Sequence, residues 1–292
     1  PYQPALNVTI YLHHSSCNYL NLDISLSPWD QPASAQSCIK KGVIENYGIW
    51  ESFGVPKTSW TTLIDDCDSC DTLTVTECKE WEIGDRIVIS ANQGRGWNPV
   101  AQQEYSSYAP TRIITSVFAE SNRCRVGMNE SLSELHRGNS FTHNSISLAA
   151  EVANFDRSIL ITGPPIHYRL MINGIGPTGT NYSDTDLDLG RLDPEMFGGQ
   201  GIATISYRPM RMSWHRMEHC GRIMLGSYCH HFHHIQACPE CKFEGIAVNK
   251  SVNKAFSIHG TSLASVKKSV VHNHRGAVIY IENGQEYGNN IT

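Results

Sequence analysis

The feature that most constrains this chain is a repeat near its C-terminal end. "VNKAFSIHG" (252–260) and "NHRGAVIYIENG" (273–284) share a polar turn followed by a short β-prone run, and Phe256 and Val278 are 22 positions apart. A period of about 20 to 25 residues is typical of solenoid rungs, which bury their apolar residues by stacking on one another. Whole rungs repeat in register, which favours a right-handed parallel β-helix over an antiparallel meander.

The rest of the chain also predicts strands. No long stretch has the apolar period of an amphipathic helix, and short β-prone runs alternate with Gly, Pro, Asn, Asp and Ser. The fold class is therefore all-β. We expect an irregular β domain over residues 1–153 and β-helix rungs over 154–292, interrupted by a Gly- and Asp-rich excursion at 177–201.

Composition excludes two classes of protein. Charged residues make up 17% of the 292, and the net charge is −5, so the chain lacks the clustered positive charge of a nucleic-acid binder. No apolar run approaches the roughly 20 residues that cross a bilayer, so we expect no membrane span in this fragment. The chain starts at Pro1 and ends within a glycosylation sequon at Asn290; we interpret it as a piece of a longer protein.

Cysteines and sequons together indicate an extracellular protein, secreted or on the cell surface. Five Asn-X-Ser/Thr sequons predict N-linked glycans at Asn7, Asn129, Asn181, Asn249 and Asn290. The ten cysteines are candidates for disulfides in such a compartment: Cys17, Cys38, Cys67, Cys70, Cys78, Cys124, Cys220, Cys229, Cys238 and Cys241. The two Cys-X-X-Cys pairs also have zinc-site spacing, but disulfides fit the compartment better.

Several stretches resemble a known extracellular family. "KKGVIENYGIWESFGVPKTSWTTL", "EWEIGDRIVIS" and "AAEVANFDRSILITG" look like the second half of a G-eight domain and its junction, and "LGSYCHHFHHI", "AFSIHGT" and "GAVIYIENGQEYGNN" look like the parallel β-helix repeats that follow it. The resemblance covers nearly the whole chain. It is to the family of fibrocystin, fibrocystin-L and the hyaluronan-depolymerising proteins.

This resemblance implies two functions. Fibrocystin-type members imply a non-catalytic structural or adhesive module of a large glycoprotein, in which a filament or coat would bring further copies of the chain together. The other branch implies a hydrolase of hyaluronan or another extracellular polysaccharide, with calcium as its ion. Fold alone does not decide between them.

A histidine cluster is the first candidate site. His231 and His233 project to one face of a strand, where two imidazoles can chelate zinc or copper. Later rungs carry His259, Glu282 and Glu286, which we expect to stack beside them. We name His231, His233 and Glu282 as metal-site candidates; the alternative is a polar ladder without a metal.

The resemblance also reveals two departures from the family pattern. The family's rung usually has His after its first Gly and Asp after its first Glu. This chain has Ala277 and Asn283 there, and neither side chain can act as a general base. Their presence favours a structural role.

An acidic stretch, "DTDLDLGRLDPE", is the second candidate site. Asp184, Asp186 and Asp188 alternate and would converge on a cation, with Glu195 as a further ligand, so we expect calcium binding here. It is not an EF-hand, because Leu189 occupies the position that needs Gly.

A glycosidase would also need two carboxyl groups. The candidates are Asp85, Glu104, Glu151 and Asp156, and we interpret each as structural first, with Glu151 and Arg157 as an ion pair. Trp97, in a Gly-rich loop, is the best candidate for stacking on a sugar.

Overall fold

The computed structural model describes residues 8–11, 44–46, 48–90, 109–163, 202–204, 208–221, 226 and 228–292. Within these ranges the regular structure consists of strands, and no helix long and apolar enough to cross a membrane occurs. The chain divides into two compact units, Val55–Arg157 and the combination of Pro1–Gly54 with Ser158–Thr292. The all-β prediction is confirmed.

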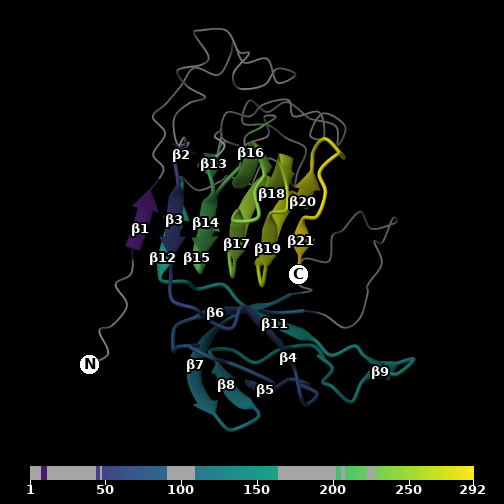
Figure 1. Ribbon diagram of the computed structural model, residues 1–292. Helices are drawn as coiled ribbons and strands as arrows, with labels where there is room; N and C mark the ends of the chain where they lie inside the picture. The colour runs from purple at the N-terminus through teal and green to yellow at the C-terminus, as the bar shows by residue number, and fades with distance from the viewer. Residues whose placement is uncertain are drawn as a thin grey trace, which may run out of the picture. The chain divides into compact units, whose positions relative to one another are not determined.

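The larger unit is a parallel β-helix with three faces (Figure 1). The first face contains β1 (Val8–Tyr11), β12 (Ile159–Thr162), β15 (His215–Glu218) and the first parts of β18 (Ala247–Ser262) and β20 (Val270–Ile281). The second contains β2 (Ile44–Asn46), β13 (Ile202–Thr204), β16 (His230–Ala237) and the later parts of β18 and β20. The third contains β3 (Trp50–Phe53), β14 (Met210–Ser213), β17 (Lys242–Glu244), β19 (Ser265–Lys267) and β21 (Asn290–Ile291).

Five rungs follow from this pairing, and every pairing between them is parallel. The long strands β18 and β20 each run through two faces of their rung, which is why β15 and β16 both pair with β18. Parallel crossover connections are right-handed in about 98% of cases, the hand expected of the predicted helix.

The repeat predicted the rungs but not their register. Phe256 lies beside Ile279, and Ala247 beside Val270, so these two rungs are offset by 23 residues rather than 22. The inferred match of Phe256 with Val278 is therefore wrong by one position. A shift of one residue exchanges the inward and outward faces of a strand, and Val278 is indeed exposed.

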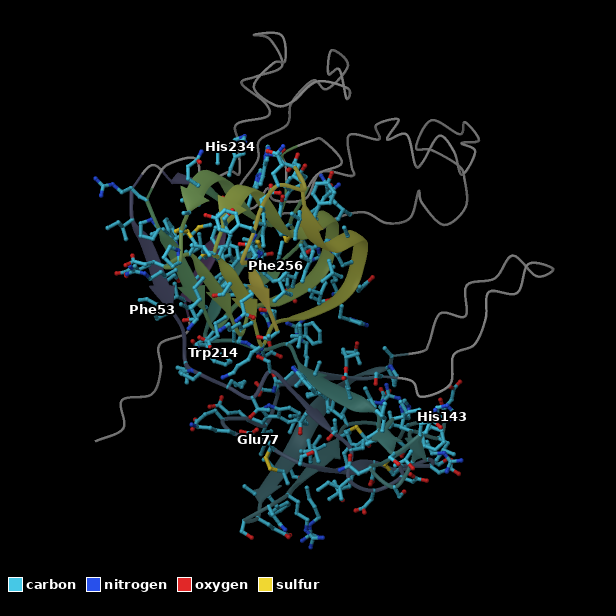
Figure 2. All side chains as sticks on the ribbon, turned by 45° about the vertical axis from the view of Figure 1, so that its right-hand side comes forward. Phe53, Glu77, His143, Trp214, His234 and Phe256 are labelled. Atoms are coloured by element: carbon cyan, nitrogen blue, oxygen red, sulfur yellow. A yellow bond between two sulfur atoms is a disulfide. The ribbon has the colours of Figure 1, made fainter. Side chains whose placement is uncertain are left out.

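Stacked aromatic rings fill the β-helix core. Phe232, Phe243 and Phe256 come from two neighbouring rungs and are almost fully buried, and the rings of Phe232 and Phe243 lie parallel with centroids 4.1 Å apart. Figure 2 shows Phe256 among the stacked strands. Burial of a large ring stabilises a fold by about 1.5–3 kcal/mol relative to exposure, so these three rings anchor the rungs that carry the candidate site.

In sequence, the smaller unit is inserted between the strands of the first rung and those of the second. The first rung ends with β3 at Phe53, and the second begins with β12 at Ile159. This differs from the predicted division at residues 153 and 154: the C-terminal edge of the insertion is close to it, but β1, β2 and β3 are rung strands. Their parallel partners lie more than 100 residues away in sequence, so no local pattern indicates the pairing.

The inserted unit is built mainly from one antiparallel sheet. Its order is β4 (Trp60–Thr62), β11 (Glu151–Asn154), β6 (Arg86–Ile89), β7 (Thr111–Ala119), β8 (Cys124–Met128) and β5 (Thr72–Val75), with a separate pair of β9 (Thr142–His143) and β10 (Ile146–Ser147). One face buries a core of its own, including Leu73, Ile87 and Val126. Alternating buried and exposed residues in β5 show why such a sequence forms a one-sided sheet.

Eight of the ten cysteines lie in the described ranges, and all eight form disulfides: Cys67–Cys70, Cys78–Cys124, Cys220–Cys229 and Cys238–Cys241. Both Cys-X-X-Cys pairs close on themselves, so the zinc alternative for these sulfur atoms is wrong. Cys17 and Cys38 lie outside the described residues.

Candidate functional site

The candidate site lies on the second face of the β-helix, where β16, β18 and β20 run side by side. In β16 the side chains alternate, so His230 and Phe232 enter the core while His231 and His233 point to the opposite side. His231 is nevertheless only 3% exposed, because Tyr228 packs its ring against the imidazole at a centroid distance of 4.8 Å.

Three histidines from two consecutive rungs meet there. In register, His233 of β16 lies beside His259 of β18. One nitrogen from each of His231, His233 and His259 can be chosen so that all three atoms lie within 4.8 Å of one another. The rings of His231 and His259 are nearly parallel, at an angle of 7°. The parallel register thus brings together residues 28 positions apart.

The next rung contributes a carboxylate. Glu282 Oε2 lies 3.4 Å from His259 Nδ1 and 3.9 Å from His231 Nε2. The Tyr228 hydroxyl donates to Oε1 at 3.3 Å, and the Ser257 hydroxyl donates to Oε2 at 3.4 Å. Glu282 is therefore held at the edge of the three imidazoles by residues of the two preceding rungs.

Glu286, which we expected beside these groups, is occupied differently. Its carboxylate accepts hydrogen bonds from the backbone N–H groups of Gly260, Asn283 and Gln285, at 2.8, 3.2 and 3.0 Å. These bonds lower the pKa of Glu286 against the opposing effect of burial. In its ionised form, Glu286 therefore fastens the loop that follows β20 to Gly260 in the preceding rung.

Burial keeps His231 and His233 neutral. It lowers the pKa of His231 well below its usual value and that of His233 to about 4, and repulsion from the neighbouring imidazoles lowers both further. The pKa of the more exposed His234 is lowered for the same reasons, and Figure 2 places His234 at the edge of the β-helix. A neutral imidazole has a free lone pair on one nitrogen, and this neutral form is the one that binds a metal.

The tautomer of His231 follows from its partners. A hydrogen bond to the Gly226 backbone opposes the lowering of the His231 pKa, whereas Nε2 is buried without a hydrogen-bond partner. Nδ1–H is therefore the donor to the Gly226 carbonyl, and Nε2 carries the lone pair. That lone pair belongs to one of the three converging imidazoles.

Two of the carboxylates considered for a glycosidase, Asp85 and Asp156, have structural partners. Asp85 accepts from Lys57 Nζ at 2.7 Å and from Asn154 Nδ2 at 2.8 Å, and Asp156 pairs with Arg86. Glu151 is exposed. The predicted structural roles of Asp85 and Asp156 thus agree with their contacts.

Arg157 has a different environment from the one expected. It is buried, and it donates to the Asn154 and Asp156 carbonyls and to the Ser59 hydroxyl. Burial lowers the pKa of Arg157 to about 10. These contacts, rather than the expected ion pair with Glu151, hold the end of the inserted unit.

The predicted glycosylation sites and several other predicted site residues lie partly outside the described residues. Asn129 and Asn290 are exposed, whereas Asn249 is only 8% exposed and donates through Nδ2 to Glu218. A glycan needs an accessible amide, so Asn129 and Asn290 are the better acceptors of these three. The following predicted residues lie outside the described ranges: Asn7, Asn181, the calcium candidates Asp184, Asp186, Asp188 and Glu195, together with Glu104 and Trp97.

Two residues that contact the site, Tyr228 and Lys254, were not predicted from the sequence. Tyr228 precedes β16, yet its ring covers His231 and its hydroxyl reaches Glu282. Lys254 Nζ lies above the rings of Tyr228 and Tyr280, 5.4 and 4.7 Å from their centroids. Both depend on rung stacking, and only the register could have revealed them.

The stacked rungs define a parallel β-helix protein whose second face carries a cluster of three histidines. Residues 196–292 match the family model described as CEMIP beta-helix. The chain is 27% identical to mouse fibrocystin-L over 270 residues, covering 86% of this chain and 6% of that protein. It is 21% identical to human cell surface hyaluronidase CEMIP2 over 225 residues, covering 74% of this chain and 14% of that protein. The chain is thus similar to fibrocystin-L and to CEMIP2, and it spans a small part of the length of these relatives.

Among solved structures, a tailspike of Pseudomonas phage phi297 is 9% identical, with 95% of this chain and 35% of that chain covered and a TM-score of 0.28.

Proposed function

We propose that the chain is a non-catalytic structural or adhesive module of a large secreted or cell-surface glycoprotein, with an extracellular polysaccharide or further copies of itself as partners. The observation that carries the proposal is the set of hydrogen bonds made by the two acidic side chains nearest the histidine cluster, Glu282 and Glu286. Glycoside hydrolysis needs one carboxyl group that remains protonated to act as an acid. Glu286 is held ionised by three backbone N–H groups, and Glu282 serves as an acceptor for two hydroxyls.

Two further features support the same role. Four disulfides fasten the described part of the chain, as suits a durable extracellular structure. Ala277 and Asn283 also stand where the family resemblance implies a histidine and an aspartate. The second face of the β-helix therefore keeps histidines of a type that can bind a metal, but it has Ala277 and Asn283 at two positions where a hydrolase would use a histidine and an aspartate.

The alternative is a polysaccharide hydrolase, the activity for which the relative CEMIP2 is named a cell surface hyaluronidase. The test is to incubate the purified chain with hyaluronan and with a panel of other glycans, with and without calcium, and to follow polymer length by size-exclusion chromatography with light scattering. We expect unchanged length beside a hyaluronidase that serves as positive control. Shortening that disappears in Glu282→Gln would contradict the proposal and assign cleavage to this face of the β-helix.

A further inference from the structure

His231 presents a buried lone pair with no partner. Its Nε2 has no hydrogen bond, although the side chain is only 3% exposed. An unsatisfied buried polar atom costs about 1–3 kcal/mol, and a bound ion is one of the ways in which native proteins satisfy such an atom. The same residue is one of three whose imidazole nitrogens converge within 4.8 Å. Two independent observations thus point to one ligand.

We infer that His231, His233 and His259 bind a divalent transition-metal ion, with zinc as the best-fitting candidate, through one imidazole nitrogen each. Imidazole suits zinc, copper and nickel, whereas calcium selects oxygen ligands. Zinc–nitrogen bonds of about 2.0–2.1 Å require the three nitrogen atoms to draw somewhat closer together. His233 and His259 are only half-buried, so their side chains have room to make that adjustment.

Glu282 is the positioning residue of this site. Its Oε2 lies 3.4 Å from His259 Nδ1, so it can accept that proton and leave Nε2 of His259 to face the ion. A carboxylate behind a ligating histidine fixes the tautomer and raises the basicity of the ligand. Tyr228 and Ser257 hold Glu282 in turn, which gives the site an outer layer of hydrogen bonds.

The ion would connect two rungs of the β-helix. His231 and His233 come from β16 and His259 from β18, and Glu282 follows β20. A metal bound by the folded chain and not by the unfolded one stabilises the fold by mass action. The inference goes beyond the proposed structural role and does not depend on it.

The test uses the whole chain after removal of metals with a chelator. Zinc is added, and binding is measured by isothermal titration calorimetry and by metal analysis after dialysis, with calcium in a parallel sample. We expect one zinc ion per chain at this site, no competition from calcium, and a higher melting temperature with zinc.

Four variants locate the ion. His233→Ala and His259→Ala should weaken zinc binding by more than the roughly 10- to 100-fold typical of losing an outer partner, whereas Glu282→Gln should weaken it within that range. His143→Ala, on the exposed pair of strands in the inserted unit, should bind like the parent chain. Far-UV circular dichroism confirms folding of each variant.

Absence of zinc binding, or equal binding by the parent chain and the doubly substituted His233→Ala, His259→Ala chain, would overturn the inference. If a variant does not fold, the visible spectrum of the cobalt-loaded parent chain decides: intense tetrahedral bands support three-imidazole ligation, and a weak octahedral spectrum contradicts it. Unchanged hyaluronan length leaves this result untouched, so the two proposals can fail separately.

Discussion

The Nε2 atoms of His215 and His230 lie 2.9 Å apart, and both imidazoles are fully buried inside one rung, to which β15 and β16 contribute its first and second faces. Nδ1–H of His230 donates to the Ala255 carbonyl at 3.1 Å. With that proton on Nδ1, the Nε2 atom of neutral His230 must accept the proton of His215 Nε2. A second proton on His230 would place two N–H groups face to face.

This pair predicts acid sensitivity. Burial lowers the pKa of His230 from 6.5 to about 4, so between these values the unfolded chain binds more protons than the folded chain. Stability is therefore complete above pH 6.5 and falls as the pH decreases towards 4, by about 3 kcal/mol for this residue. Urea unfolding at pH 7.5 and 4.5 measures the loss.

The matched comparison is the His215→Leu, His230→Phe double variant, which replaces both partners by apolar groups. Other histidines whose pKa is lowered, such as His231 and His233, keep their own pH dependence in both chains. The variant should therefore retain a slope, but a shallower one. An identical pH dependence of the two unfolding midpoints would show that the pair does not resist protonation.

The stacked phenylalanines predict a large core effect. Phe243 is fully buried, with its ring against Phe232 and near Phe256. Phe243→Ala should lower the free energy of unfolding by about 3–5 kcal/mol, because it removes apolar contact and leaves a cavity. Phe53→Ala, at a side chain that is 62% exposed in the same unit, should change it by no more than about 0.5 kcal/mol. Similar effects in chemical denaturation would argue against this core.

Two disulfides predict different stabilities from loop length. Cys78–Cys124 closes a separation of 46 residues and Cys238–Cys241 one of 3. Chain entropy of the unfolded state gives about 4 kcal/mol for the first and about 2 kcal/mol for the second. Double Cys→Ala variants of each pair, compared by denaturation, should show this order. The reverse order would mean that native-state effects exceed chain entropy here.

Alanine substitutions at two glycines should distinguish the cost of backbone strain from the cost of a steric clash. Gly245 and Gly84 both have positive φ, at 65° and 95°, but a Cβ at Gly245 would lie 2.2 Å from Trp214 Cε3 while nothing lies within 4 Å of one at Gly84. Gly84→Ala should cost about 1–2 kcal/mol through backbone strain alone. Gly245→Ala should cost clearly more, because the indole must move. Equal melting temperatures would contradict this packing.

The sequence revealed the rungs more readily than their connections. The β-prone repeats after residue 245 indicated stacking, and the alternation in β16 correctly placed His231 and His233 on one face, with His259 and Glu282 beside them. The 22-residue match failed because a polar turn can absorb one residue without changing its composition. The first rung was missed because the partners of β1, β2 and β3 lie after the inserted unit in sequence. The His215–His230 pair was missed because it joins two faces of one rung, and strand periodicity does not indicate which side chains meet across the turn between them.

The parallel register of β16 and β18 brings imidazole nitrogens of His231, His233 and His259 within 4.8 Å of one another, where we infer that they bind one ion. X-ray absorption at the zinc edge of the zinc-loaded chain tests it most directly. The account predicts three imidazole nitrogens at about 2.0–2.1 Å from the ion, with outer-shell scattering from their rings that decreases in His259→Ala. A first shell of oxygen atoms alone, or of sulfur at about 2.3 Å, would contradict it.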